Sequence, residues 1–179
     1  MKKYLLFVLI MAITLPMSGQ EFTSLQSESS MKITGTSTLH DWNIDVNSFS
    51  AKAVLVGESI EKVEFSAEVE SLKSGTSSMD KNTYKALNAD KYPKIKFKGQ
   101  NMTGSNGNIN IKGDLTISGV TKPIAFKATQ ERWAEQSMSF KGTYTFKMSD
   151  FGIDPPRAML GTIRTGDEIT IDFKIVMYQ

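Results

Sequence analysis

The alternation of apolar and polar residues over residues 107–130 constrains this chain to a β fold more than any other stretch does. The segment is GNINIKGDLTISGVTKPIAFKATQ, with apolar residues at odd positions before Gly119 and at even positions after it. A period of two is typical of half-buried strands. A two-residue turn at Gly119 and Val120 explains the change of parity, because Gly supplies the positive φ that a type II′ turn needs first. In this register Leu115 faces Ile124, and both apolar sets lie on one face of a hairpin.

The loop before this hairpin predicts a third strand in the same sheet. A three-residue loop at 105–107, with Gly107 left-handed in a G1 bulge, places Phe97 opposite Leu115. Phe97, Leu115 and Ile124 then form one row across three strands.

The same alternation recurs along most of the chain and predicts about eight strands. It appears near residues 31–39, 42–56, 60–71, 94–103, 138–148 and 167–178, in addition to the two strands of the hairpin. Short connections indicate antiparallel pairing. One apolar and one polar face per strand suit an all-β, closed eight-stranded antiparallel barrel, since closure leaves no free edges. A two-sheet sandwich has similar periodicity and is the alternative fold.

Two segments interrupt the β pattern. After a Gly/Ser-rich loop, residues 79–89 predict one short helix, with Ser78 or Asp80 as its cap and Tyr92-Pro93 beyond its end. Residues 149–166 exceed the usual length of a connection, so we expect a lid or a loop at a cavity mouth.

The first residues have the pattern of a secretory signal peptide. Lys2 and Lys3 precede an apolar run over 4–15, and small residues follow near a cleavage point. The run is shorter than the roughly 20 residues of a membrane span. We therefore expect a signal peptide over 1–20, a loose lead over 21–30, a β-barrel domain over 31–179, no transmembrane span in the mature chain, and a periplasmic or secreted location.

Composition excludes several classes of function. The chain has 21 Lys and Arg against 19 Asp and Glu, and loss of Lys2 and Lys3 leaves 19 against 19, a formal net charge of zero. Such a balance favours neither nucleic acid nor an anionic membrane as a partner. The lysines at 94, 96 and 98 alternate along one strand, so a solvated outer face is the better interpretation than a binding patch.

Catalytic and metal sites also find little support in the composition. The absence of Cys excludes disulfides, thiolate metal sites, a Cys nucleophile and a lipidated N-terminal Cys. His40 is the only histidine, which leaves no metal-binding trio, and the chain contains no nucleophile elbow. We therefore expect no catalytic residues, no metal, no cofactor and no enzyme activity.

Three stretches resemble the YceI-like family of bacterial periplasmic or secreted proteins: 79–99, 113–123, and 146–155 with 166–175. The segment GDLTISGVTKP at 113–123 is the most specific of them, and GTSTLH at 35–40 adds to the similarity. The resemblance implies a lipocalin-like eight-stranded barrel that holds a long isoprenoid chain in an apolar tunnel and catalyses no reaction. It further implies a polyprenyl lipid or an isoprenoid quinone as ligand, carried or stored in the cell envelope.

The apolar face of the strands supplies the candidate residues of such a tunnel. A filled core would show the same pattern, because burial of these side chains is favourable with or without a ligand. Small inward residues (Ala67, Gly99, Gly113, Ala128 and Gly142) leave room across from the aromatic rings. The candidate lining residues are Phe65, Phe97, Ile111, Leu115, Phe126, Phe140, Tyr144, Phe146, Ile171 and Phe173.

A polar headgroup would need partners at the mouth of the tunnel, and the candidates are His40, Trp42, Lys122 and Arg157. Two alternatives stay open: a ligand-free structural or interaction barrel, and a lipid-acting enzyme that uses His40 and the 149–166 loop. The sequence leaves the oligomeric state open, a dimer included.

Overall fold

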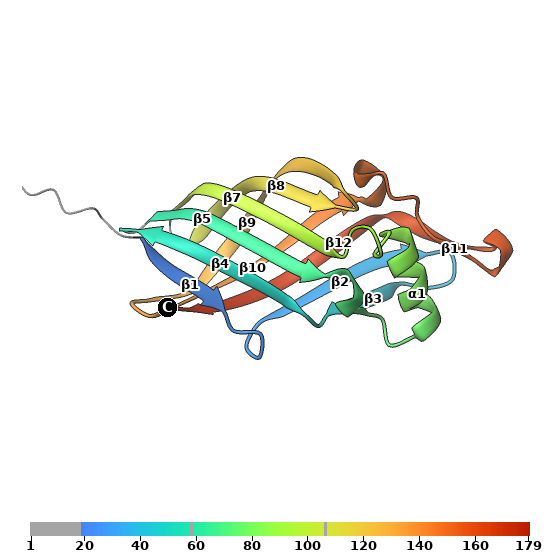
Figure 1. Ribbon diagram of the computed structural model, residues 1–179, viewed down its shortest axis with the longest axis horizontal. Coiled ribbons are helices and arrows are strands. Elements are labelled where there is room, and N and C mark those ends of the chain that lie inside the picture. The colour runs from blue at the N-terminus through green and yellow to red at the C-terminus, as the bar shows by residue number, and fades with distance from the viewer. Residues whose placement is uncertain (1–18, 58, 106) are drawn as a thin grey trace, which may run out of the picture.

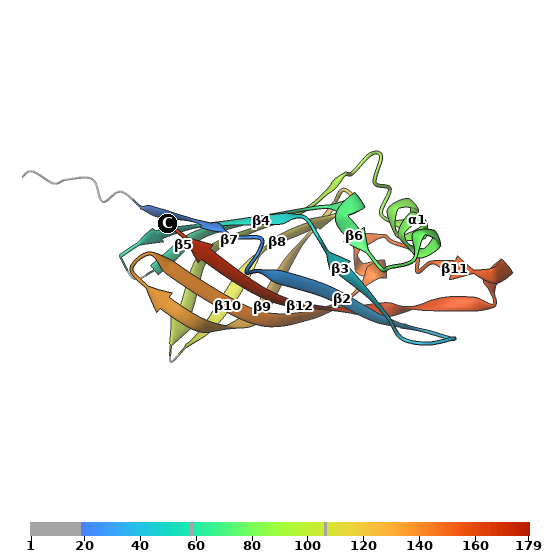
Figure 2. The same ribbon diagram turned by 90° about the horizontal axis from the view of Figure 1, so that it is seen from below.

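The computed structural model describes residues 19–57, 59–105 and 107–179. These residues form an elongated barrel of strands with one α-helix at one end and the C-terminus at the other (Figures 1 and 2). Most of the predicted signal peptide lies outside the described residues.

The elements follow the chain in the order shown in Figure 1. The strands are β1 Gln20–Ser24, β2 Ser30–Ser37, β3 Trp42–Val46, β4 Phe49–Val56, β5 Ser59–Glu68, β6 Leu72–Lys73, β7 Lys94–Ser105, β8 Asn108–Ile117, β9 Val120–Ala134, β10 Ser137–Lys147, β11 Arg157–Ala158 and β12 Ile163–Tyr178. The helices are η1 Val69–Ser71, α1 Ser77–Ala86, η2 Met148–Phe151 and η3 Met159–Gly161.

The strands close into an eight-stranded antiparallel barrel, which confirms the predicted fold and excludes the two-sheet sandwich. From β4 each strand pairs with the next in the order β5, β7, β8, β9, β10 and β12. Strand β12 then pairs with both β1 and β2, and β1 pairs back to β4. Strands β1 and β2 lie along one edge of β12 and act as a single strand, interrupted by a turn at residues 25–29.

The prediction of a loose lead over residues 21–30 is wrong for β1. Phe22 is 1% exposed and pairs with Ala53 on β4, which is wholly buried. This strand could not be recognised from the sequence, because Phe22 is its only apolar residue and one apolar position shows no period. Strand β1 therefore belongs to the barrel wall.

The β8–β9 hairpin has a register two residues away from the predicted one. Leu115 pairs with Lys122 rather than Ile124, and Ile124 pairs with Gly113. The central turn residues are Ser118 and Gly119, with φ of 49° and 78°, so both have the positive φ of a type I′ turn. A shift of two residues keeps each side chain on its face. The predicted apolar face is therefore correct although the predicted turn is not.

The loop before β8 also differs from the prediction. Ser105 pairs with Asn108, which leaves two residues between the strands rather than three, and Asn106 lies outside the described residues. The extra residue is instead accommodated by an irregularity between Gly99 and Thr103. The left-handed Gly107 (φ 76°) is confirmed, and so is the pairing of Phe97 with Leu115.

Helix α1 confirms the short helix predicted near 79–89, and it begins two residues earlier. Its N-cap is Thr76 rather than Ser78 or Asp80. Asp80 instead accepts hydrogen bonds from the backbone N–H and the hydroxyl of Ser74, at 2.8 and 2.6 Å. The Tyr84 hydroxyl lies 3.0 Å from the Leu72 carbonyl oxygen and can donate to it. These contacts attach α1 to the chain that follows β5.

The predicted mouth loop at 149–166 has a buried root and an exposed tip. Phe151 and Ile153 are 2% and 5% exposed, so they anchor the loop to the barrel. Beyond them β11 pairs with the start of β12 and forms a short hairpin at the α1 end of the molecule (Figures 1 and 2).

On the outer face, the lysine stripe of β7 lies between acidic strands. Lys98 is paired with Glu64 on β5 and Asp114 on β8, and Lys94 Nζ lies 2.9 Å from a Glu68 carboxylate oxygen. This charge pairing supports the solvated outer face.

Candidate functional site

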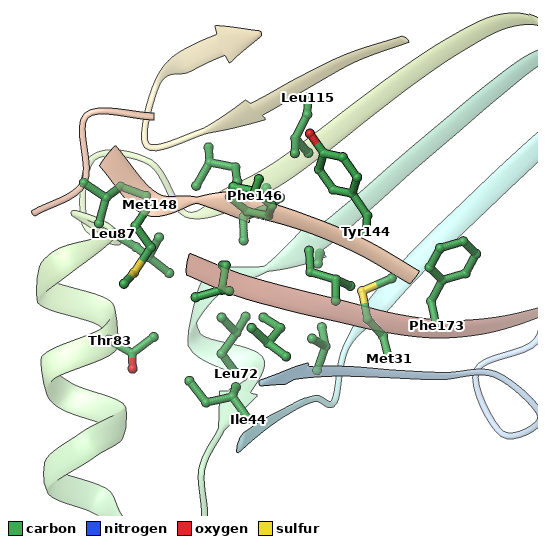
Figure 3. A pocket seen from close by; sticks show the side chains of 18 of the residues that line it. Met31, Ile44, Leu72, Thr83, Leu87, Leu115, Tyr144, Phe146, Met148 and Phe173 are labelled. Atoms are coloured by element: carbon green, nitrogen blue, oxygen red, sulfur yellow. The ribbon is translucent and has the colours of Figure 1, made fainter. Parts of the chain in front are cut away.

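The barrel encloses an apolar cavity of about 520 Å³. This volume falls within the range of roughly 300–1,000 Å³ that is typical of small-molecule sites. Strand β12 lines the cavity from Ile163 and Thr165, at the α1 end, to Met177, near the C-terminus, and does so at alternate positions from Ile169 onward. At about 3.3 Å per residue, that length of wall runs along most of the barrel. Figure 3 shows part of the wall, with side chains from several strands converging on one space.

The structure brings all ten predicted tunnel residues to this cavity. They come from six strands, and alternation along each strand explains why they share the inner face. Whether they contact a ligand remains a proposal. The ten are Phe65 on β5, Phe97 on β7, Ile111 and Leu115 on β8, Phe126 on β9, Phe140, Tyr144 and Phe146 on β10, and Ile171 and Phe173 on β12.

The aromatic members form a continuous chain along one side of the wall. The ring of Phe126 lies 5.9 Å from Phe97, 5.5 Å from Tyr144 and 5.8 Å from Phe173, between ring centroids. Tyr144 stacks on Phe146 at 5.4 Å. Contacts at these separations are favourable beyond the burial of area alone. The wall is therefore held by its own packing.

Glycines on the neighbouring strands make room for these rings. The ring of Phe97 covers Gly113, where an added Cβ would lie 2.7 Å from Phe97 Cζ and would also clash with the Lys98 carbonyl oxygen. Phe173 covers Gly142 in the same way. The small residues were predicted to leave free space, but aromatic rings occupy the space at these two glycines.

Three of the four predicted mouth residues, His40, Trp42 and Arg157, line the cavity at its α1 end. Trp42 donates from Nε1 to the Thr36 carbonyl oxygen at 3.0 Å, which fixes its ring across Gly35. His40 is exposed, and its Nδ1 lies 2.7 Å from the Asp41 carbonyl oxygen.

Lys122 does not line the cavity, so its prediction as a mouth residue is not supported. It shares the inward parity and pairs with Leu115, but it is exposed near the tip of the β8–β9 hairpin. Parity places a residue on a face of the sheet, and it cannot tell how far the cavity extends along that face.

Sequence reasoning missed a group of lining residues around the mouth. Met79, Thr83 and Leu87 face the cavity from α1 and the residue just beyond it, and Figure 3 shows Thr83 and Leu87 on the side of the helix that faces the strands. Their spacing of four residues is a helical signal that could have found them. From the strands and their extensions, Met31, Ile44 and Leu72 also contribute.

Charge is scarce on the cavity wall. Among the described residues, Arg157 is the only Lys or Arg that lines it, and no Asp or Glu does. The polar lining residues other than Tyr144 gather at the α1 end, and they are Ser37, His40, Thr76, Ser78, Asn82, Thr83, Arg157 and Thr165. The site is thus an apolar chamber with a polar rim.

The Tyr144 hydroxyl is the polar group of the middle of the wall. Every fully buried side-chain polar atom of the described residues has a hydrogen-bond partner. The Tyr144 hydroxyl has none among them, so it is not fully buried and is open to the cavity that Tyr144 lines. Burial, and secondarily the charge of Asp150, raise the pKa of Tyr144 above its usual value. The group therefore stays a neutral hydroxyl that can donate to a bound molecule.

Within the described residues, no cluster of His, Cys, Asp and Glu side chains has the arrangement of a metal site. None of the helices in the same part of the chain has the length and apolar character of a membrane-spanning helix.

Comparison with known proteins assigns most of the chain to one family. The family described as "YceI-like domain" matches residues 19–177. A UPF0312 protein of Pseudomonas putida is 34% identical over 110 residues, which cover 57% of each chain. A UPF0312 protein of a Shewanella species is 42% identical over 73 residues, covering 37% of this chain and 38% of the relative. The aligned part thus spans 57% of the first relative and 38% of the second, less than two thirds of either.

Solved structures share the fold at low sequence identity. BcnA of Burkholderia cenocepacia superposes with a TM-score of 0.74 at 18% identity, over 86% of this chain and 98% of that one. A protein of Saccharophagus degradans, described as a polyisoprenoid binding domain implicated in plant cell wall breakdown, has a TM-score of 0.74 at 11% identity, covering 88% and 97%. At these identities the likeness shows a common barrel.

Proposed function

Because this chain belongs to the YceI-like family, we propose that it binds a long apolar chain, a polyprenyl lipid or an isoprenoid quinone, inside the barrel. The cavity is the observation that carries the proposal: about 520 Å³ of space with an apolar wall and a polar rim at one end. The polyisoprenoid binding described for the Saccharophagus degradans domain supports this class of ligand.

The physics of the wall favours a hydrocarbon chain over a polar ligand. Removing apolar surface from water stabilises a complex by about 25 cal/mol per Å². A polyprenyl tail can gain this energy along the whole chamber without any hydrogen bond. A charged headgroup deep inside the chamber would lose its hydration, and among the described lining residues only Arg157, at the α1 rim, is charged. We therefore place the tail inside and the polar end at the α1 rim.

The rim offers chemistry suited to a headgroup. Arg157 supplies the positive charge, and Ser78, Asn82 and Thr83 supply hydroxyl and amide groups. A phosphate would use Arg157, whereas a quinone carbonyl would accept from hydroxyl or amide donors. Trp42 limits one side of the rim through its fixed ring.

Binding accounts for the site better than catalysis does. The His40 ring makes no hydrogen bond to a side chain of the described residues, so it lacks the orienting partner of a general base. A lipid-acting enzyme would also need a reactive group near the apolar wall.

We propose that the protein carries or stores this lipid in the cell envelope. The expected signal peptide over residues 1–20 supports export. Fractionation of the native host, with mass measurement of the purified chain, tests this role. A periplasmic or secreted protein that lacks the first residues is expected, and an uncleaved cytoplasmic chain would contradict it.

Blocking the chamber tests the binding proposal. Ile171 lines the middle of the cavity from β12, and Lys174 lies on the outer face of the same strand. Ile171→Trp should reduce the affinity for a fluorescent polyprenyl probe by roughly tenfold or more, since lost burial weakens the complex. Lys174→Trp should bind as the unmodified protein does. Equal binding by both variants, or no binding by the unmodified protein, would favour a ligand-free barrel.

A further inference from the structure

Exposed apolar side chains gather at the end of the barrel where the cavity has its polar rim. Among the described residues, five large hydrophobic side chains are exposed, and three of them belong to this end: Leu39 at 65%, Met159 at 72% and Leu160 at 109%. Figures 1 and 2 show the hairpin of β11 and β12 projecting beyond α1. We call residues 157–164 of this hairpin the tip.

Leu39 and the tip form one continuous surface. The Thr38 backbone N–H donates to the Arg164 carbonyl oxygen at 3.0 Å, and the Thr38 hydroxyl donates to the Thr162 carbonyl oxygen at 3.3 Å. The Arg164 N–H donates to the same hydroxyl at 3.1 Å. These bonds hold the turn that contains Leu39 against the tip. Leu39 also lines the cavity, so the surface adjoins the mouth.

The backbone of the tip is strained at its two exposed apolar residues. Met159 and Leu160 have φ of 50° and 55°, a left-handed conformation that residues with a Cβ rarely adopt. The Thr162 N–H donates to the Met159 carbonyl oxygen at 3.1 Å and stabilises this turn. Gly or Asn would adopt it with less strain. Two largely exposed apolar residues in a strained turn are unfavourable for the isolated protein and point to contact with another apolar phase.

The charged residues beside Met159 and Leu160 indicate what kind of apolar phase these side chains contact. Residues 155–166 contain two arginines and no acidic residue. Arg157 on β11 and Arg164 on β12 lie opposite each other in the strand pairing of the tip, and both side chains are exposed. Neither forms an ion pair with a described residue. Apolar side chains flanked by arginines suit the interface of an anionic lipid bilayer.

We propose that the tip docks the mouth of the barrel onto the surface of an anionic membrane. Leu160, Met159 and Leu39 insert among the lipids, and Arg157 and Arg164 contact phosphate groups. The cavity then opens toward the bilayer, so an apolar molecule can pass between membrane and barrel with little contact with water. This docking does not depend on which ligand the cavity holds.

Vesicle co-sedimentation of the full chain tests the proposal without any cavity ligand. The protein should bind vesicles of phosphatidylcholine and phosphatidylglycerol in equal parts, and bind vesicles of phosphatidylcholine alone more weakly. Leu160→Asn should lower binding roughly tenfold, the loss expected for one buried Leu. Asn tolerates the left-handed conformation, so the same variant should unfold at an equal or higher urea concentration. This urea measurement distinguishes a loss of membrane contact from a loss of binding caused by misfolding.

Two further variants complete the test. Arg157→Gln with Arg164→Gln should abolish the preference for phosphatidylglycerol. Trp133 lies at the opposite end of the barrel, paired with Met138, and is 38% exposed. Trp133→Ser should bind vesicles as the unmodified protein does. Undiminished binding by Leu160→Asn, or no binding by the unmodified protein, would overturn the proposal. A vesicle-free dimer that Leu160→Asn converts to a monomer would also overturn it, since the tip would then contact a second copy.

Discussion

Phe173 on β12 covers Gly142, its partner on β10, so that the ring occupies the space of the side chain that Gly142 lacks. A Cβ at Gly142 would lie 2.6 Å from Phe173 Cζ. Phe97 likewise covers Gly113 on β8, although its own pairing partner on that strand is Leu115. Aromatic rings of the wall therefore pack over glycines of adjacent strands, which leaves the axis of the barrel open.

Replacing Gly142 tests this arrangement directly. Gly142→Ala should push the Phe173 ring into the cavity, because the Lys127 carbonyl oxygen, 3.1 Å from the new Cβ, blocks movement the other way. Overpacking of this kind costs about 1–3 kcal/mol. Urea denaturation should show that loss, and affinity for a polyprenyl probe should fall with it. Lys141→Ala, at the exposed position next along β10, should change neither quantity by a comparable amount.

The inner face of this barrel was predictable from sequence because the period of a strand is two. Alternation placed Phe126 and Ile171 correctly on one face even though no pairing between their strands was known. The same property hid the register of the β8–β9 hairpin. Registers that differ by two residues keep every side chain on its face. The apolar pattern is therefore the same whether Leu115 lies opposite Ile124 or opposite Lys122.

Contacts between segments distant in sequence determine the hairpin turn and the orientation of α1, which the period of two does not specify. Ser118 holds a positive φ in the turn, and its hydroxyl donates to the Leu87 carbonyl oxygen at 2.8 Å, across 31 positions of sequence. The mouth residues of α1 were missed for a related reason. The Tyr84 hydroxyl donates to the Leu72 carbonyl oxygen on β6, whereas Met79 and Thr83 of the same helix line the cavity, and these contacts are made with segments outside the helix.

The β8–β9 turn offers a test that separates backbone strain from a steric clash. Gly119 and Gly161 have φ of 78° and 89°, but only Gly119 has a close neighbour, the Tyr92 ring at 2.5 Å from a new Cβ. Gly161→Ala should cost about 1–2 kcal/mol for its conformation alone. Gly119→Ala should cost more, by about 1–3 kcal/mol of overpacking. Urea midpoints measure both, and equal losses would show that Tyr92 moves aside freely.

The ionisation of Tyr144 reports on the interior of the barrel. Burial raises the pKa of Tyr144, so the neutral hydroxyl is the form that the fold stabilises. That stability is present below the unfolded pKa near 10 and is lost as pH rises through the folded pKa. Absorbance titration should show one tyrosine ionising at higher pH than an ordinary tyrosine does. Tyr144→Phe should remove that late step, and persistence of the step in the variant would assign it to another tyrosine.

The hydrogen bonds of Asp80 predict how acid affects the mouth. The hydroxyl and N–H of Ser74 lower the pKa of Asp80, so its contribution to stability is present above the unfolded pKa of about 3.9 and is lost as pH falls through the lower folded pKa. Hydrogen exchange of the α1 amides should accelerate in that acid range. In Asp80→Ala the exchange should already be fast at neutral pH. Asp90→Ala, at an exposed position beyond the helix, serves as the control.

Our claim that the cavity holds an apolar chain is tested by native mass spectrometry of protein purified from its own host. We expect a population heavier than the mature chain by the mass of one lipid, and organic extraction should release an isoprenoid of that mass. Ile171→Trp, purified in the same way, should lack the heavier population. A single species at the mass of the bare chain, with no lipid in the extract, would contradict the claim.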